Sequence, residues 1–179
     1  MAALSAEPPR TELTWGSGHE APDVLSGGVR KSCSDDRDYR AIVLHNFLEA
    51  VLISDPQTDM SGAALSVRAG SWQNPPELPG LAHLLEHMLF LGTDKYPDES
   101  SYRQYLNENG GSSNAYTAAE TTNFHFEVLP KAFEGALDRF AQFFMCPLFT
   151  ASATARELLA VDSGASRRAR ARGRCSAAV

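Results

Sequence analysis

The stretch GLAHLLEHMLFLGT, residues 80–93, decides the fold. No helix breaker lies between Leu81 and Leu91, so this run predicts a helix. Gly92 suits the left-handed position that commonly follows the last helical residue, and we expect the helix to end there. The preceding residues 70–80 hold three prolines and predict a loop.

Two histidines and a glutamate within this helix form the pattern H-x-x-E-H. His83 and His87 are four residues apart and share one helix face, so both imidazoles can reach one metal ion. A catalytic zinc takes three protein ligands and a water, and Glu86 is placed to act on that water. The pattern is the inverted form of the common zinc-peptidase signature. Taken alone, an ordinary helix surface could carry the same three residues.

The flanking segments predict an α+β fold, a mixed, largely antiparallel sheet with helices packed on one face. Apolar or alternating runs predict strands at 39–44, 48–54, 63–67, 114–117 and 123–128, the first two forming a hairpin. Two further helices are expected at about 100–109 and at about 150–161. A third is expected to begin at Pro130, because an apolar stripe at helical spacing follows it: Phe133, Leu137, Phe140, Ala141 and Phe144.

Composition divides the chain into three parts. Residues 1–37 are rich in Ala, Pro, Gly and Ser and predict a flexible leader. Residues 38–163 predict one partial zinc-peptidase domain. Residues 164–179 contain five of the 13 arginines, no acid and no apolar face, so we expect a disordered tail.

Charge and cysteine content limit the class of protein. The net charge is −6, and residues 1–163 hold 11 basic and 22 acidic groups, a net of −11. Such an acidic body disfavours nucleic-acid and anionic-lipid partners, and no run is apolar enough for a signal peptide or membrane span. Three scattered cysteines (Cys33, Cys146 and Cys175) argue against a disulfide framework. These features predict a cytoplasmic protein.

Several stretches closely resemble the insulysin–pitrilysin–nardilysin metallopeptidases, also called inverzincins. They are residues 80–93, 95–97, 111–117, 134–144, 146–149, 156–157 and 160–163, within a similarity running from about 39 to 163. The resemblance implies a zinc-dependent metalloendopeptidase acting on peptides. It implies that His83 and His87 are ligands of Zn²⁺ and that Glu86 is the general base for its water.

The same resemblance implies roles for three further residues. Asn114 and Ala115 would lie on an edge strand whose backbone pairs with an extended peptide substrate. Glu157 would be a catalytic-site carboxylate that orients a ligand or the metal water. Each also has an ordinary alternative, since Asn114 could simply start a strand after a Gly-Ser turn and Glu157 could be a solvated helical residue.

The chain departs from the family at one decisive position. The family's third zinc ligand is a glutamate directly after Val-Asp-Ser, and here Ser163 is followed by Gly164, which has no side chain to coordinate. We therefore expect weak metal binding and impaired activity. The tail from Gly164 suggests a different exon or an out-of-frame reading. The alternatives are a non-catalytic fragment that binds peptides or pairs with the remaining domains of a full-length relative, and a product that does not fold stably.

Overall fold

The computed structural model describes residues 23–24 and 31–160 of the 179-residue chain. It forms two compact units, Met1–Thr58 and Asp59–Val179, which are considered separately. The predicted tail, including Gly164, lies outside the described residues, as does most of the predicted leader.

The first unit contains a three-stranded antiparallel sheet in the order β1-β2-β3. Its strands are β1 (Asp23–Val24), β2 (Asp38–Val43) and β3 (Glu49–Ser54). The predicted hairpin is confirmed, and its turn closes where the Leu44 N–H donates to the Leu48 carbonyl over 2.9 Å. β1 pairs with β2 from within the stretch predicted as a leader, and two residues are too few to show a periodic pattern.

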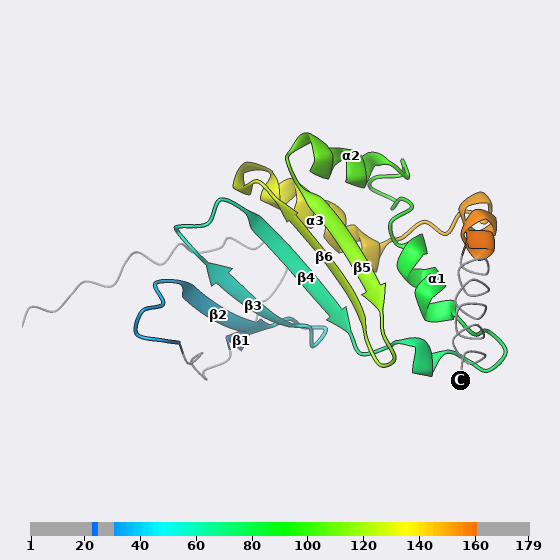
Figure 1. The fold of residues 1–179 in the computed structure, drawn as a ribbon, viewed down its shortest axis with the longest axis horizontal. Coiled ribbons are helices and arrows are strands. Elements are labelled where there is room, and N and C mark those ends of the chain that lie inside the picture. The colour runs from blue at the N-terminus through cyan, green and yellow to red at the C-terminus, as the bar shows by residue number, and fades with distance from the viewer. Residues whose placement is uncertain (1–22, 25–30, 161–179) are drawn as a thin grey trace, which may run out of the picture. The chain divides into compact units, whose positions relative to one another are not determined.

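The second unit is built on another antiparallel sheet, in the order β4-β6-β5 (Figure 1). Its strands are β4 (Ser61–Val67), β5 (Ser112–Thr117) and β6 (Thr122–Val128). β6 is central because both neighbours pair with it, and β5 is an edge strand in the described part of the chain. All three strands were expected, over the slightly shorter ranges 63–67, 114–117 and 123–128.

Helices supply the other layer of this unit. They are α1 (Leu81–Met88), α2 (Ser101–Glu108) and α3 (Phe133–Met145), with helical residues also at 151–160. Two 3₁₀ turns, η1 (Ser71–Gln73) and η2 (Pro130–Ala132), precede α1 and α3. Among the described residues, no helix has both the length and the apolar character needed to cross a membrane.

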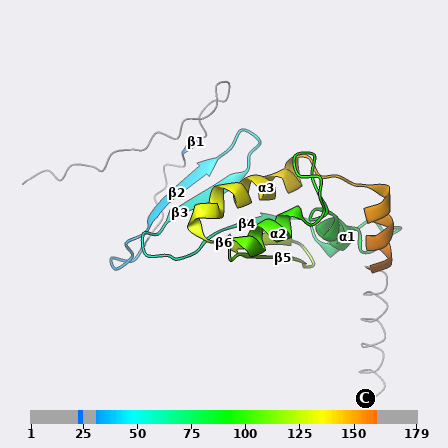
Figure 2. The ribbon, with the colours of Figure 1, turned by 90° about the horizontal axis from the view of Figure 1, so that it is seen from above.

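Alternation along β6 builds the core between sheet and helices. Phe124, Phe126 and Val128 are at most 3% exposed and share one face of the strand, because side chains alternate along a strand. The ring of Phe126 packs edge-on against Phe140 of α3, with centroids 5.2 Å apart. Leu106 of α2 belongs to the same cluster. α2 and α3 therefore cover one face of the sheet, as the α+β prediction required (Figure 2).

Four expectations need correction. α1 ends at Met88, not at Leu91, because the N–H groups of Phe90 and Leu91 bond three residues back and tighten the chain before Gly92 at φ 94°. The predicted loop 70–80 contains the turn η1. Pro130 begins the 3₁₀ turn η2, which precedes α3, and does not begin α3 itself. The strands form two three-stranded sheets where one sheet was expected.

Candidate metal centre

The loop before α1 supplies the helix with its N-terminal cap. Gly80 precedes the first helical residue at φ 95°, a left-handed conformation suited to glycine, and offers no capping side chain. The side-chain oxygen of Asn74 instead accepts the N–H of Ala82 over 2.9 Å. This bond satisfies one of the N–H groups that a helix start leaves without an internal partner. The loop therefore helps to define where α1, with its histidines, begins.

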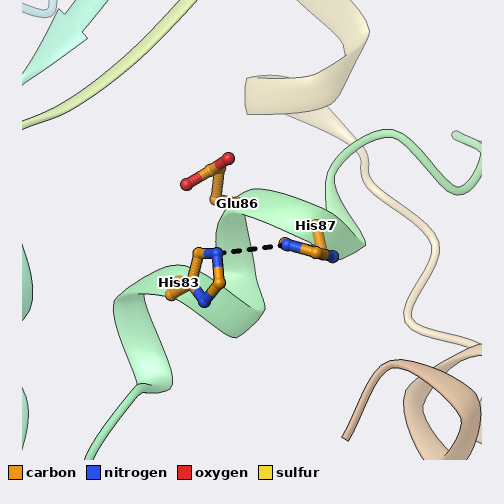
Figure 3. A group of neighbouring side chains, drawn as sticks. All are labelled: His83, Glu86 and His87. Carbon is orange, nitrogen blue, oxygen red and sulfur yellow. Dashed lines mark hydrogen bonds between the residues drawn. The ribbon is translucent and has the colours of Figure 1, made fainter. Parts of the chain in front are cut away.

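The two imidazoles of α1 face each other. Nε2 of His83 lies 3.2 Å from Nε2 of His87, with ring centroids 4.7 Å apart and planes at 83° (Figure 3). Two nitrogens bound to one tetrahedral zinc at about 2.0–2.1 Å stand roughly 3.3 Å apart. The pair therefore has the separation that a shared zinc requires.

His87 is also held from the side opposite His83. Its Nδ1 lies 2.8 Å from Oε2 of Glu157, in the helical segment 151–160. A carboxylate on Nδ1 favours the tautomer that carries the proton there, and this leaves the lone pair of Nε2 available to a metal. Glu157 therefore contacts the predicted zinc ligand His87.

The carboxylate of Glu86 is buried, with 8% of the residue exposed. The Thr117 hydroxyl donates to its Oε2 over 2.5 Å. Thr117 is the last residue of β5, so this bond joins the helix of the motif to the edge strand. Sequence reasoning assigned Thr117 no role, because a contact across 31 residues leaves no local pattern.

His83, Glu86 and His87 form the one group of at least three possible metal ligands found in the described part of the chain. One ligand atom from each lies within 4.8 Å of the others. Two convergent imidazoles and a nearby carboxylate fit zinc in kind and spacing, but the set is incomplete. The position expected to supply the third ligand is Gly164, outside the described residues.

Asn114 and Ala115 lie in β5, as predicted, opposite His125 and Phe124 of β6. The side-chain oxygen of Asn114 accepts the N–H of Ala115 over 3.0 Å. Because that N–H donates to a side chain of its own strand, we infer that it points to the open edge of the sheet. A peptide pairing there would have to displace Asn114 from it.

Comparison with known proteins agrees with this arrangement. The family model "Insulinase (Peptidase family M16)" matches residues 49–171, past Ser163, where the similarity was expected to stop. The position of the domain boundary stays a prediction. The insulin-degrading enzyme of Drosophila melanogaster is 57% identical over 142 residues, covering 79% of this chain. A peroxisomal insulin-degrading enzyme-like protein of Arabidopsis thaliana is 56% identical over 146 residues, covering 80%.

Similarity extends to solved structures, but only to a small part of each relative. The crystal structure of pitrilysin matches with a TM-score of 0.78 and 41% identity, covering 83% of this chain and 16% of that one. The chain spans 14% of the Drosophila protein and 15% of the Arabidopsis protein. From the matched family model and these identities, the chain belongs to the insulinase family of peptidases, family M16.

Proposed function

We propose that this chain is a zinc-dependent metalloendopeptidase domain that binds extended peptides, with hydrolysis impaired by the glycine at position 164. The observation that carries the proposal is the pair of imidazole nitrogens 3.2 Å apart beside a buried glutamate. Membership of a peptidase family supports the reaction class.

Each residue of the site has a role in this proposal. His83 and His87 would hold the zinc, and Glu157 would orient His87 through Nδ1. When bound, zinc supplies Lewis acidity, which polarises a peptide carbonyl and lowers the pKa of a water to about 7. Glu86 would take the proton of that water, its carboxylate positioned by Thr117.

β5 would hold the substrate. An extended peptide added to the open edge bonds to main-chain groups and so accepts many sequences. Glu86 is hydrogen-bonded to the last residue of the same strand, so a peptide on β5 would pass the site of the proposed chemistry. This arrangement supports Asn114 and Ala115 as substrate-binding residues.

Restoring the missing ligand tests the proposal. The chain as written should bind zinc weakly and cleave little, while Gly164→Glu should bind zinc more tightly by orders of magnitude. Cleavage of a quenched fluorescent peptide by Gly164→Glu should be abolished by a chelator and by Gly164→Glu/Glu86→Gln. Cleavage that survives Glu86→Gln would contradict the role of Glu86.

A second function is a non-catalytic peptide-binding or partner-pairing fragment. The open edge of β5 favours it, because strand pairing needs no metal. Peptide binding by the metal-free chain, with no cleavage even in Gly164→Glu, would select this function. The remaining domains of a full-length relative are the partner that we propose for such pairing.

We further propose a cytoplasmic location, supported by the three scattered cysteines. The net charge of −6 supports the absence of nucleic-acid and membrane partners. Fractionation of cells that express the tagged chain tests the location, and recovery in a membrane or organelle fraction would contradict it.

A further inference from the structure

The helical segment 151–160, which carries Glu157, is held in its unit by little apolar packing. Ala153 is the one side chain of this segment that is buried. Leu158 and Leu159, directly after Glu157, are 50% and 74% exposed. A helix of this length is marginal in water unless tertiary packing stabilises it. The position of Glu157 therefore depends on polar contacts as well as on burial.

Arg156 makes a polar contact that reaches outside the segment. Its guanidinium donates to Oε2 of Glu99 over 2.5 Å. Glu99 lies in a turn before α2 in which the Asp98 carboxylate accepts both the N–H and the hydroxyl of Ser100, each over 2.7 Å. These bonds restrain the turn, so Glu99 offers Arg156 a partner in a defined position.

The neighbours Arg156 and Glu157 contact two different elements. Glu157 reaches Nδ1 of His87 on α1 over 2.8 Å, while Arg156 reaches the turn before α2. Because side chains of one helix keep their relative positions, a restraint on Arg156 also limits how far Glu157 can move from the imidazole. The contact is sensitive to such movement, since a shift of about 1 Å takes this nitrogen and oxygen out of hydrogen-bond range.

We propose that Arg156, paired with Glu99, is a positioning residue of the candidate metal centre. It holds Glu157 against His87, which keeps the imidazole proton on Nδ1 and turns the lone pair of Nε2 toward the metal position. The role rests on the proposed zinc-binding function. The side chains of Arg156 and Glu99 are 54% and 42% exposed, and exposed ion pairs make modest contributions. The pair therefore changes the population of the Glu157 contact by a small factor.

The tautomer of His87 in the metal-free chain tests this role without zinc or catalysis. ¹⁵N NMR of the histidine rings at about pH 9, where imidazole is neutral, distinguishes a proton on Nδ1 from one on Nε2, and His87→Gln assigns the signal. In the parent chain we expect the proton mainly on Nδ1. Arg156→Gln should lower the ratio of Nδ1–H to Nε2–H about 1.5- to 5-fold, the range of an exposed ion pair. Arg156→Lys keeps the charge and should restore most of the ratio.

Three comparisons separate the ion pair from other effects of the substitution. Glu99→Gln should give the same change as Arg156→Gln, and the double variant should change no more than either, because each removes the same pair. Arg68→Gln, the same substitution at an exposed arginine directly after β4, should leave the ratio unchanged. In about 1 M salt the difference between the parent and Arg156→Gln should shrink, since exposed charges are screened.

Zinc binding by Gly164→Glu separates this role from the proposed function. A tautomer ratio that is the same in the parent, Arg156→Gln and Glu99→Gln would overturn the positioning role, and zinc bound by Gly164→Glu would leave the function standing. A parent chain with the proton mainly on Nε2 would overturn the role as well. A ratio lowered in both variants, with no zinc bound by Gly164→Glu, would support the positioning of Glu157 by Arg156 and contradict the metal-binding function.

Discussion

His87 is the residue on which the proposed metal site depends most, because both of its ring nitrogens are engaged. Nε2 faces His83 at 3.2 Å and Nδ1 faces Glu157 at 2.8 Å. The carboxylate restricts the rotation of the ring and favours the tautomer whose Nε2 lone pair is available, and both effects favour binding of a cation. Glu157 is thus expected to contribute to metal affinity without touching the metal.

Replacing Glu157 with Ala should lower zinc affinity about 10- to 100-fold in the Gly164→Glu background. Glu157→Gln should fall in between, because an amide oxygen still accepts from Nδ1 but carries no charge. Competition with a chromophoric chelator measures the affinities. The control is Glu120→Gln, an exposed carboxylate that does not belong to the group of His83, Glu86 and His87. Equal affinity for Glu157→Ala and its parent would contradict the orienting role.

Thr117 should matter to stability even without metal. Thr117→Val keeps the shape but leaves the buried Glu86 carboxylate without this donor, which should cost about 1–3 kcal/mol of unfolding free energy. Thr117→Ser keeps the hydroxyl and should retain most of the unfolding free energy of the parent chain. Urea denaturation of the metal-free chain measures these values. In a Glu86→Gln background the cost should shrink, and a cost unchanged there would show that the hydroxyl acts through other contacts.

At the scale of elements, α1 depends on a cap from its preceding loop. Asn74→Ala removes the acceptor of the Ala82 N–H and should lower the unfolding free energy by about 1 kcal/mol. Because the histidines follow directly, zinc affinity in the Gly164→Glu background should fall as well. Glu77→Ala, at an exposed position in the same loop, is the control. A stability equal to that of the control would mean that the helix start needs no cap.

A polar cluster ties the loop after α1 to α3 and should make stability depend on pH. Asp138 accepts from Lys95 over 2.7 Å and from Tyr96 over 2.5 Å, and these bonds hold its pKa below the ordinary 3.8. Bonding to Asp138 raises the pKa of Lys95 above its ordinary 10.5. Because the pKa of Asp138 is lowered in the folded state, this carboxylate stabilises the fold above about pH 3.8. That contribution is lost as the pH falls through the pKa of Asp138 in the folded chain. Because the pKa of Lys95 is raised in the folded state, this lysine stabilises the fold below about pH 10.5. That contribution is lost as the pH rises through the pKa of Lys95 in the folded chain.

Asp138→Asn should therefore lower the melting temperature between about pH 4 and pH 10, with the difference fading on the acid side. Thermal unfolding followed by circular dichroism across this range measures it. Asp94→Asn, an exposed acid in the same loop, is the control. A difference from the parent that persists undiminished at pH 2 would assign the effect to something other than ionisation of Asp138.

Most helices and strands were predictable from sequence, because the spacing of apolar residues that identifies them involves only residues close together in the chain. The spacing of His83 and His87 and the alternation along β6 each require only neighbouring residues, and both predictions of placement were confirmed. Contacts that cross the fold could not be anticipated, since Thr117 meets Glu86 only after β5 and α1 are brought together. The early end of α1 depends on turn hydrogen bonds that propensity does not specify.

At the scale of the molecule, the hydrophobic core of the second unit holds the strands and helices that carry the candidate metal centre. Phe124 is 2% exposed, with its ring centroid 5.2 Å from that of Phe144. Phe124→Ala should cost about 3–5 kcal/mol, a large share of the stability of a small domain. Cooperative thermal unfolding should be weakened or lost, and zinc binding with it. Phe149→Ala, 55% exposed, should leave the transition near its original temperature. An unchanged transition in Phe124→Ala would contradict the described core.

The measurement that tests the metal site most directly is zinc per chain, by elemental analysis after dialysis, in Gly164→Glu with and without His83→Ala/His87→Ala. We expect about one zinc per chain in the glutamate-containing variant and almost none once both histidines are removed. Zinc content that is unchanged by removal of both imidazoles would contradict the site.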